Sequence, residues 1–207
     1  MFERVTIRAS DPAASQRFYD TVLETLGIER SGDAAWADFQ VVPASDERPV
    51  TRGLHVGFAA PSREHVDRFW EAGTRAGYRD DGAPGPRPEY GQDYYGGFLL
   101  DPDGNSAEAV HNDSLREGGA VDHLWIRVAD VAASKRYYET LAPYAGFRLQ
   151  ADLPQRAQFL GNTGSFSVVL GEPTKNFEMA FRTLQPGYPG GELDPDGNRV
   201  ELVPNPR

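Results

Sequence analysis

Residues 124–148, LWIRVADVAASKRYYETLAPYAGFR, decide the fold because they repeat residues 5–29, VTIRASDPAASQRFYDTVLETLGIE. The two stretches align without a gap at a constant offset of 119, and ten of the 25 positions are identical. A second pair of similar stretches lies further along, with LDPDGNSAEAV at 100–110 and LDPDGNRVELV at 193–203. The chain is therefore a tandem repeat, and each repeat is interpreted as a structural unit.

Each copy of the first repeat predicts a strand followed by a helix. In the first copy Val5 and Ile7 alternate with polar residues, as in a half-buried strand. The residues at 10–12, Ser-Asp-Pro, are typical of a helix start, and Gly27 and Gly146 are expected to end the two helices. Between the copies, another strand, helix and hairpin form a second unit, so the pattern predicts four units.

The fourth unit is shorter than the second unit, which it otherwise matches. From Phe58 to Asp101 the sequence advances 43 residues, whereas from the matching Phe181 to Asp194 it advances only 13. The missing residues correspond to a helix and to a loop rich in glycine, proline and tyrosine. We therefore expect an uncovered sheet face, with exposed apolar side chains that favour a homodimer or another partner. The candidates on that face are Phe181, Val200 and Leu202.

The composition excludes several classes of function. The formal net charge of −10 disfavours a nucleic-acid partner, because phosphate binding needs clustered basic residues. The chain has no cysteine, which excludes thiolate nucleophiles and cysteine-bound metal. It has no apolar run long enough for a membrane span and no signal-peptide pattern at its start. We therefore expect no membrane partner and a cytoplasmic location.

The sequence resembles the vicinal oxygen chelate superfamily, which contains glyoxalases, extradiol dioxygenases, fosfomycin-resistance enzymes and bleomycin-binding proteins. The resemblance rests on VTIRASDPAASQRFYDTVL at 5–23, HVGFAAPSREHVDRFWEAG at 55–73, GAPGPRPEYGQDYYGGFLLDPDGNSAEAV at 82–110 and DHLWIRVADVAASKRYYETL at 122–141. It implies an α+β fold of four tandem βαβββ-type units, the fourth lacking its helix, in two glyoxalase-like curled-sheet domains. These domains are expected at 1–113 and 120–207, joined by a linker at 114–119.

The resemblance also implies positions for a metal site. The family takes one ligand from the first strand of an odd unit, one from the first strand of an even unit, and a glutamate from the last strand of that even unit. Side chains two residues apart share a strand face and converge on the concave side of a curled sheet. The matching odd-unit positions are Arg4 and His123, and the even-unit positions are His55 with Glu108 and Glu178 with Glu201.

Two pairings of the units remain open. If units pair within each half, His123 joins Glu178 and Glu201, while Arg4, which cannot coordinate a metal, joins the other set. If units two and three pair, the set becomes two histidines and one carboxylate, which suits Fe, Mn, Ni or Zn with open positions for substrate. The crossed pairing is the simpler interpretation, because it leaves one complete metal site and one degenerate second site. The complete site is then His55, Glu108 and His123, and the degenerate site is Arg4, Glu178 and Glu201.

The resemblance implies a metal-dependent enzyme that acts on a small oxygenated molecule, in which the ion is a Lewis acid. Ser167 and Val169 do not supply the fourth carboxylate of glyoxalase I, which leaves dioxygenase-like or lyase/isomerase-like chemistry open. The alternative is a metal-free protein of the bleomycin-resistance type that binds a drug or metabolite. Roles are expected for Tyr94, Tyr95 and Glu172 in catalysis, and for Tyr90, Trp125 and Arg127 in substrate binding.

Overall fold

The computed structural model of the protein describes residues 1–112, 118–183 and 192–204, so most of the predicted linker lies outside the described residues. The elements follow in chain order: β1 (Phe2–Ala9), α1 (Pro12–Leu23), the short 3-10 helix η1 (Glu24–Leu26), β2 (Ala35–Trp36), β3 (Phe39–Pro43), β4 (His55–Ala59), α2 (Arg63–Arg75), β5 (Arg79–Pro86), β6 (Tyr95–Leu100), β7 (Ser106–His111), β8 (Val121–Val128), α3 (Val131–Ala145), β9 (Arg148–Leu153), β10 (Arg156–Leu160), β11 (Ser165–Leu170), β12 (Glu178–Thr183) and β13 (Arg199–Pro204).

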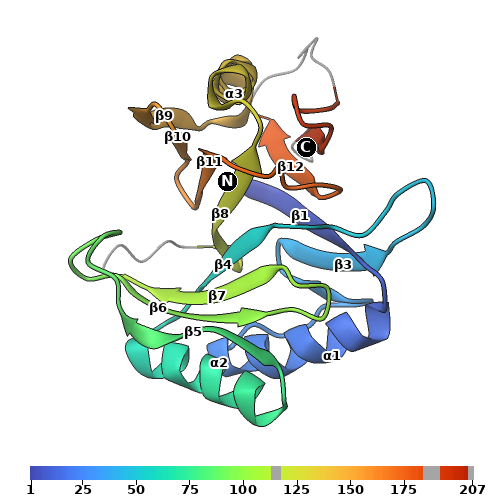
Figure 1. Ribbon diagram of the computed structural model, residues 1–207, viewed down its shortest axis with the longest axis vertical. Coiled ribbons are helices and arrows are strands. Elements are labelled where there is room, and N and C mark those ends of the chain that lie inside the picture. The colour runs from blue at the N-terminus through green and yellow to red at the C-terminus, as the bar shows by residue number, and fades with distance from the viewer. Residues whose placement is uncertain (113–117, 184–191, 205–207) are drawn as a thin grey trace.

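The strands form two curled, open sheets, which confirms the predicted α+β class (Figure 1). The larger sheet has eight strands in the order β5-β6-β7-β4-β8-β11-β10-β9. The smaller sheet has five strands in the order β13-β12-β1-β3-β2. One continuous core of buried apolar side chains fills the space between the sheets and the helices.

Each sheet combines strands from both sides of the predicted linker. In the larger sheet, β4 of the second unit runs antiparallel to β8 of the third unit. In the smaller sheet, β1 of the first unit runs antiparallel to β12 of the fourth unit. The units therefore pair crosswise. The division of the chain at 114–119 into 1–113 and 120–207 follows the sequence rather than the sheets, and it stays a prediction.

Local signals in the sequence set the helix ends. The side chains of Asp11 and Asp130 each accept a hydrogen bond of 3.0 Å from the backbone N–H three residues on. Gly27 and Gly146 adopt left-handed φ angles of 74° and 71°, as expected for residues that end helices. No helix among the described residues is long and apolar enough to cross a membrane.

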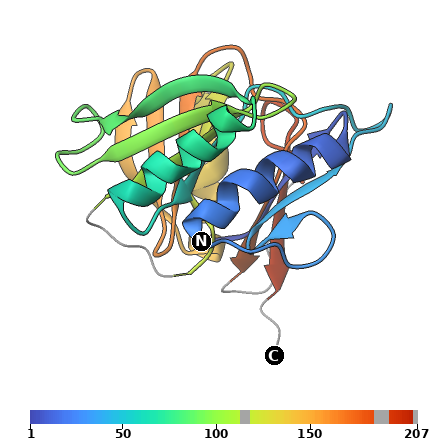
Figure 2. The same cartoon turned by 90° about the horizontal axis from the view of Figure 1, so that it is seen from below.

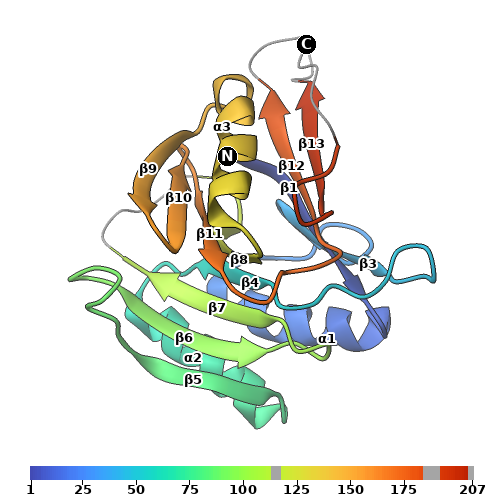
Figure 3. The same ribbon diagram turned by 45° about the horizontal axis from the view of Figure 1, so that its top comes forward.

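The helices cover the outer faces of the sheets unequally. Helices α1 and α2 lie side by side, α1 against β1 and β3 and α2 against β5, β6 and β7 (Figure 2). Helix α3 has no such companion, because the described residues between β12 and β13 form no helix. It instead contacts β9, β10 and β11 of the larger sheet and also β12 of the smaller sheet (Figure 3).

This position of α3 corrects the prediction of an exposed apolar face on the fourth unit. Phe181 is fully buried, Val200 is 5% exposed and Leu202 is half-buried. The ring of Phe181 packs against the rings of Phe147 and Phe166, with centroids 5.1 and 5.9 Å apart. Side chains from the third unit therefore cover the surface that a fourth helix would have covered.

The two DPDGN turns are tied to the helices of the preceding units. The hydroxyl of Tyr19 on α1 donates to Oδ2 of Asp101 at 3.2 Å, and the hydroxyl of Tyr138 on α3 donates to Oδ2 of Asp194 at the same distance. The two tyrosines occupy equivalent positions in the repeat. Each half of the chain thus has its own buried polar contact between odd and even units, although the sheets are shared.

Candidate metal centre

Three neighbouring strands place the predicted ligands on one face of the larger sheet. Glu108 on β7 is the register partner of Gly57 on β4, and Gly57 is also the register partner of His123 on β8. His55 lies two residues before Gly57 and so faces the same side. A Cβ atom on Gly57 would overlap the imidazole ring of His123. The glycine therefore leaves the space in which the three candidate ligand side chains meet.

The three ligand atoms lie close together. Nε2 of His55 is 2.9 Å from Oε2 of Glu108 and 3.3 Å from Nε2 of His123. Nε2 of His123 is 3.2 Å from Oε2 of Glu108. The side chains of the two histidines are 19% and 15% exposed, and that of Glu108 is 1% exposed. In the described part of the chain, this is the one group of three or more histidine, aspartate or glutamate side chains whose ligand atoms lie close enough together to hold a metal ion.

This spacing fits a divalent metal. Zinc-to-ligand bonds are about 2.1 Å, so three ligands that meet the ion at right angles lie about 3.0 Å from one another. The observed separations are 2.9, 3.2 and 3.3 Å. Two imidazoles and one carboxylate on one side of an ion leave its other side open, which is the arrangement of the two-histidine, one-carboxylate sites of iron and related metals.

Each of the three side chains is held by a further polar group. Nδ1 of His55 lies 3.1 Å from Oγ of Ser106, whose hydroxyl donates to Asp81 at 2.7 Å. Nδ1 of His123 lies 3.0 Å from Oδ2 of Asp122. Such partners direct Nε2 of each ring toward the centre and are typical of metal-binding histidines. Gly96 on β6 makes room for Glu108, because a Cβ atom there would crowd Oε1 of its carboxylate.

Ion pairs within this cluster set the charges of Glu108 and His123. Burial by itself raises the pKa of Glu108, but hydrogen bonds to His123 and His55 bring it down to about 2. Burial by itself lowers the pKa of His123, but its hydrogen bonds to Asp122 and Glu108 prevail and raise it to about 10. His123 is therefore a cation and Glu108 an anion at neutral pH.

The alternation of side chains along a strand separates the two tyrosines predicted to act in catalysis. The hydroxyl of Tyr94 donates to Oε1 of Glu108 at 2.7 Å. Tyr95 points to the other face, where its hydroxyl donates to Asp67 on α2 at 2.8 Å. Burial and the neighbouring Glu108 carboxylate raise the pKa of Tyr94, which therefore remains a hydrogen-bond donor. The structure brings Tyr94 to the histidines and leaves Tyr95 outside.

The candidate ligands lie in a cavity of about 810 Å³ on the concave face of the larger sheet. This volume is within the range of small-molecule sites. Tyr90, Trp125 and Arg127, predicted to bind substrate, all line the cavity, and the rings of Tyr90 and Trp125 are 6.4 Å apart. Glu172, the predicted base, is instead exposed beyond the end of β11 and does not line the cavity.

Arg156 and Gln158 on β10 line the cavity but are not among the predicted site residues. Cζ of Arg156 lies 5.1 Å from the ring centroid of Trp125, and its Nη2 donates to Oε1 of Gln158 at 3.0 Å. Both residues alternate with the buried Ala157 and Phe159. That pattern is typical of a half-buried strand with a polar face, and it would have placed Arg156 and Gln158 on the concave side.

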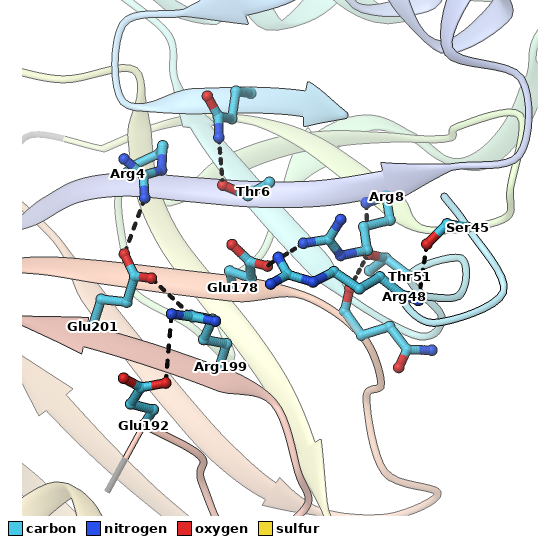
Figure 4. Close-up of polar contacts among 12 residues, drawn as sticks. Arg4, Thr6, Arg8, Ser45, Arg48, Thr51, Glu178, Glu192, Arg199 and Glu201 are labelled. Carbon is cyan, nitrogen blue, oxygen red and sulfur yellow. Dashed lines mark hydrogen bonds and ion pairs between the residues drawn. The ribbon is translucent and has the colours of Figure 1, made fainter. Parts of the chain in front are cut away.

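The predicted degenerate site forms on the smaller sheet as a set of ion pairs (Figure 4). Ala180 on β12 is the register partner of both Arg4 on β1 and Glu201 on β13, so it occupies the place that Gly57 has on the larger sheet. Nη2 of Arg4 reaches over to Oε2 of Glu201 at 3.1 Å. A guanidinium group thus lies where His123 lies in the other sheet.

The remaining carboxylate of this face is also neutralised. Glu178 accepts hydrogen bonds from Arg8 and from Nη1 of Arg48, the latter at 3.3 Å (Figure 4). Glu201 accepts a second bond from Nε of Arg199 at 2.7 Å. The structure therefore brings Arg4 and Glu201 together, while Glu178 pairs with other arginines.

The chain is similar to known proteins in its sequence. Residues 2–109 match the Glyoxalase/Bleomycin resistance protein/Dioxygenase superfamily. A glyoxalase/bleomycin resistance protein from Albidiferax ferrireducens T118 is 32% identical, over 54% of this chain and 99% of that chain, with a TM-score of 0.48. No curated protein matches the sequence. The chain belongs to the Glyoxalase/Bleomycin resistance protein/Dioxygenase superfamily.

Nearly the whole chain is also similar in fold to a known structure. Glyoxalase I from Zea mays superposes with a TM-score of 0.64 over 97% of this chain and 90% of that chain. The two sequences are 16% identical, so the likeness concerns the fold.

Proposed function

We propose that this protein holds a divalent ion of iron, manganese, nickel or zinc through His55, Glu108 and His123 and acts as an enzyme on a small oxygenated molecule. The observation that carries the proposal is the separation of 2.9 to 3.3 Å among the three ligand atoms at the wall of a cavity. Members of this superfamily differ in their reactions, so the fold alone does not select one. The donor set favours dioxygenase-like or lyase/isomerase-like chemistry.

The surrounding side chains would prepare this site for a substrate. When bound, the ion would supply a Lewis acid to a molecule that offers two neighbouring oxygen atoms. Tyr94 fixes one carboxylate oxygen of Glu108, so that Oε2 faces the histidines. Trp125 and Tyr90 provide aromatic walls for the cavity. Arg127 lines the same cavity and adds a positive charge at its β8 side.

Elemental analysis of protein purified without an affinity tag tests this proposal. We expect about one metal ion per chain in the parent, and about a tenth of that or less in His55→Ala and His123→Ala. His65→Ala is the matched control, because this half-buried histidine on α2 contacts Ser62 and lies outside the cavity. A parent protein that takes up no Fe(II), Mn(II), Ni(II) or Zn(II) would contradict the proposal. Parent protein that takes up a metal would be reconstituted under anaerobic conditions and then screened for turnover of vicinal diols and catechols, with and without O2.

A second candidate function is metal-independent binding of a drug or metabolite. The ion pair between Nε2 of His123 and Oε2 of Glu108, 3.2 Å apart, favours it, because it gives the buried carboxylate a partner within the protein. Ligand affinity that persists after chelation and in His123→Ala would support this function. Affinity or turnover that disappears under both treatments would support the metal enzyme.

A further inference from the structure

The guanidinium groups on the two concave faces differ in their partners. On the smaller sheet, Arg4 is paired with Glu201, and Arg48 is paired with Glu178 (Figure 4). In the cavity of the larger sheet, Arg156 contacts the Trp125 ring and Gln158 and has no carboxylate partner among the described residues. A positive charge at a cavity wall without a protein anion is suited to an anion from a ligand.

Arg156 is held in place by neutral groups. Its guanidinium lies over the face of Trp125, and Nη2 is fixed by Gln158. Gln158 on β10, Ser167 on β11 and Trp125 on β8 are successive register partners, so all three share one rung of the sheet. Nε of Arg156 is buried and has no hydrogen-bond partner in the described structure. The side chain is thus positioned in advance, while its hydrogen-bonding capacity is only partly used.

The charges that line the cavity are divided between its two sides. Glu89 and Asp93 are exposed and belong to the loop between β5 and β6, at one edge of the larger sheet. Arg127 and Arg156 belong to β8 and β10 on the other side. Of the acidic residues near these strands, Asp122 and Glu108 are already engaged by His123. An anionic group of a bound ligand would therefore lie near β8 and β10.

We infer that Arg156 binds a carboxylate group of the substrate, at a distance from the oxygen pair that the triad's metal would take. This inference rests on the proposed function for the chemistry at the other end of the molecule. The ring of Trp125, which the guanidinium of Arg156 contacts, belongs to a residue whose Cα atom lies roughly 7 Å along β8 from that of His123, and β10 lies two strands further across the sheet. Simple 2-oxo acids, in which the carboxylate adjoins the second oxygen, are too short to reach both groups. The substrate class is an elongated carboxylic acid with vicinal oxygens at its far end.

A pair of probes that differ only in this charge tests the inference. The probes are 3-(3,4-dihydroxyphenyl)propionate, whose carboxylate is remote from its diol, and its neutral methyl ester. Their affinities for Zn(II)-loaded protein are measured anaerobically by calorimetry, beside the metal content of each sample. We expect the parent to bind the acid at least about tenfold more tightly than the ester, because a charge-assisted hydrogen bond is lost in the ester.

Variants assign this preference to one side chain. Arg156→Gln should bind acid and ester equally. Arg156→Lys keeps the charge but loses the planar guanidinium that stacks on Trp125, so it should retain part of the preference for the acid. Arg75→Gln removes a charge from an exposed site on α2 and should behave as the parent does. Circular dichroism confirms that each variant is folded.

The outcomes separate this inference from the proposed function. A parent that holds zinc but binds acid and ester equally, or binds neither, overturns the proposed role of Arg156 and leaves the proposed metal site standing. A preference that survives in Arg156→Gln also overturns it. A parent that takes up none of Fe(II), Mn(II), Ni(II) and Zn(II) yet prefers the acid, with the preference lost in Arg156→Gln, contradicts the metal enzyme and supports the carboxylate site.

Discussion

Gly57 on β4 and His123 on β8 are register partners, and the imidazole ring of His123 occupies the space that a side chain on Gly57 would take. The equivalent pair on the smaller sheet is Ala180 and Arg4, where a methyl group fills this position and the guanidinium reaches Glu201. The absence of a side chain at residue 57 is therefore part of the geometry that lets two histidines and a carboxylate converge.

Gly57→Ala should consequently remove the candidate metal site while leaving the fold in place. The added methyl group must displace His123, so we expect metal content to fall at least about tenfold and the free energy of unfolding to fall by about 1 to 3 kcal/mol. Gly91→Ala is a control at the same cavity, because its Cβ atom would meet only Cβ of Tyr94, at 3.8 Å. Full metal occupancy in Gly57→Ala, measured by elemental analysis, would contradict the packing argument.

The neighbouring tyrosines offer a matched comparison. Tyr94→Phe removes the hydroxyl that holds Oε1 of Glu108, and we expect metal affinity to fall by about 10- to 100-fold, as for other outer partners of metal ligands. Tyr95→Phe removes a hydroxyl that bonds to Asp67 on the far side of the sheet, so metal affinity should be unchanged. Competition with a chromophoric chelator measures both, and equal losses would show that the contact with Glu108 has no special role.

Metal affinity should also rise with pH in the neutral range. A histidine must be neutral to bind a metal, whereas the pKa of His123 in the metal-free protein is raised to about 10. Protonated His123 therefore competes with the ion at every pH below this value, and affinity should increase about tenfold per pH unit between pH 6 and 8. Glu108, with a pKa lowered to about 2, is ionised throughout and adds no dependence. Calorimetry in buffers of different ionisation enthalpy should show the released proton, and a pH-independent affinity would oppose this account.

Much of the fold could be predicted because the same strand and helix signals occur in both copies of the repeat. The strand alternation, the capping by Asp11 and Asp130 and the stops at Gly27 and Gly146 are local signals, and local physics decides them. The choice between the two pairings of units is not local. It depends on which edges of β4 and β8 meet in space, and no stretch of sequence in either unit encodes that by itself.

The positions of Glu172 and Phe181 also have non-local causes. Glu172 follows β11, but the chain turns away there and the side chain ends in solvent. The burial of Phe181 depends on the contact of α3 with β12 and on the rings of Phe147 and Phe166, which is a tertiary effect without a local sequence pattern. The alternation of polar and buried residues along β10 predicts that Arg156 faces the concave side, whereas the family resemblance implies only the strands that carry metal ligands.

The ion pair of Glu178 with Arg8 and that of Glu201 with Arg4 should differ in their contribution to stability. Glu178 is paired with Arg8, whose side chain is only 9% exposed, whereas Arg4 and Glu201 are 37% and 29% exposed. Glu178→Gln leaves a buried guanidinium without a counter-charge, and we expect the free energy of unfolding to fall by about 3 kcal/mol. Glu201→Gln leaves charges that water can solvate, so the loss should be under about 1 kcal/mol.

Urea unfolding of both variants measures this difference, and metal content provides an internal control. The pairs lie on the smaller sheet, while the candidate ligands lie on the larger one, so both folded variants should keep the metal occupancy of the parent. Added salt should reduce the effect of Glu201→Gln more than that of Glu178→Gln, because screening acts mainly on exposed charges. Equal losses of the free energy of unfolding in the two variants would show that the burial of Arg8 does not increase the contribution of its ion pair to stability.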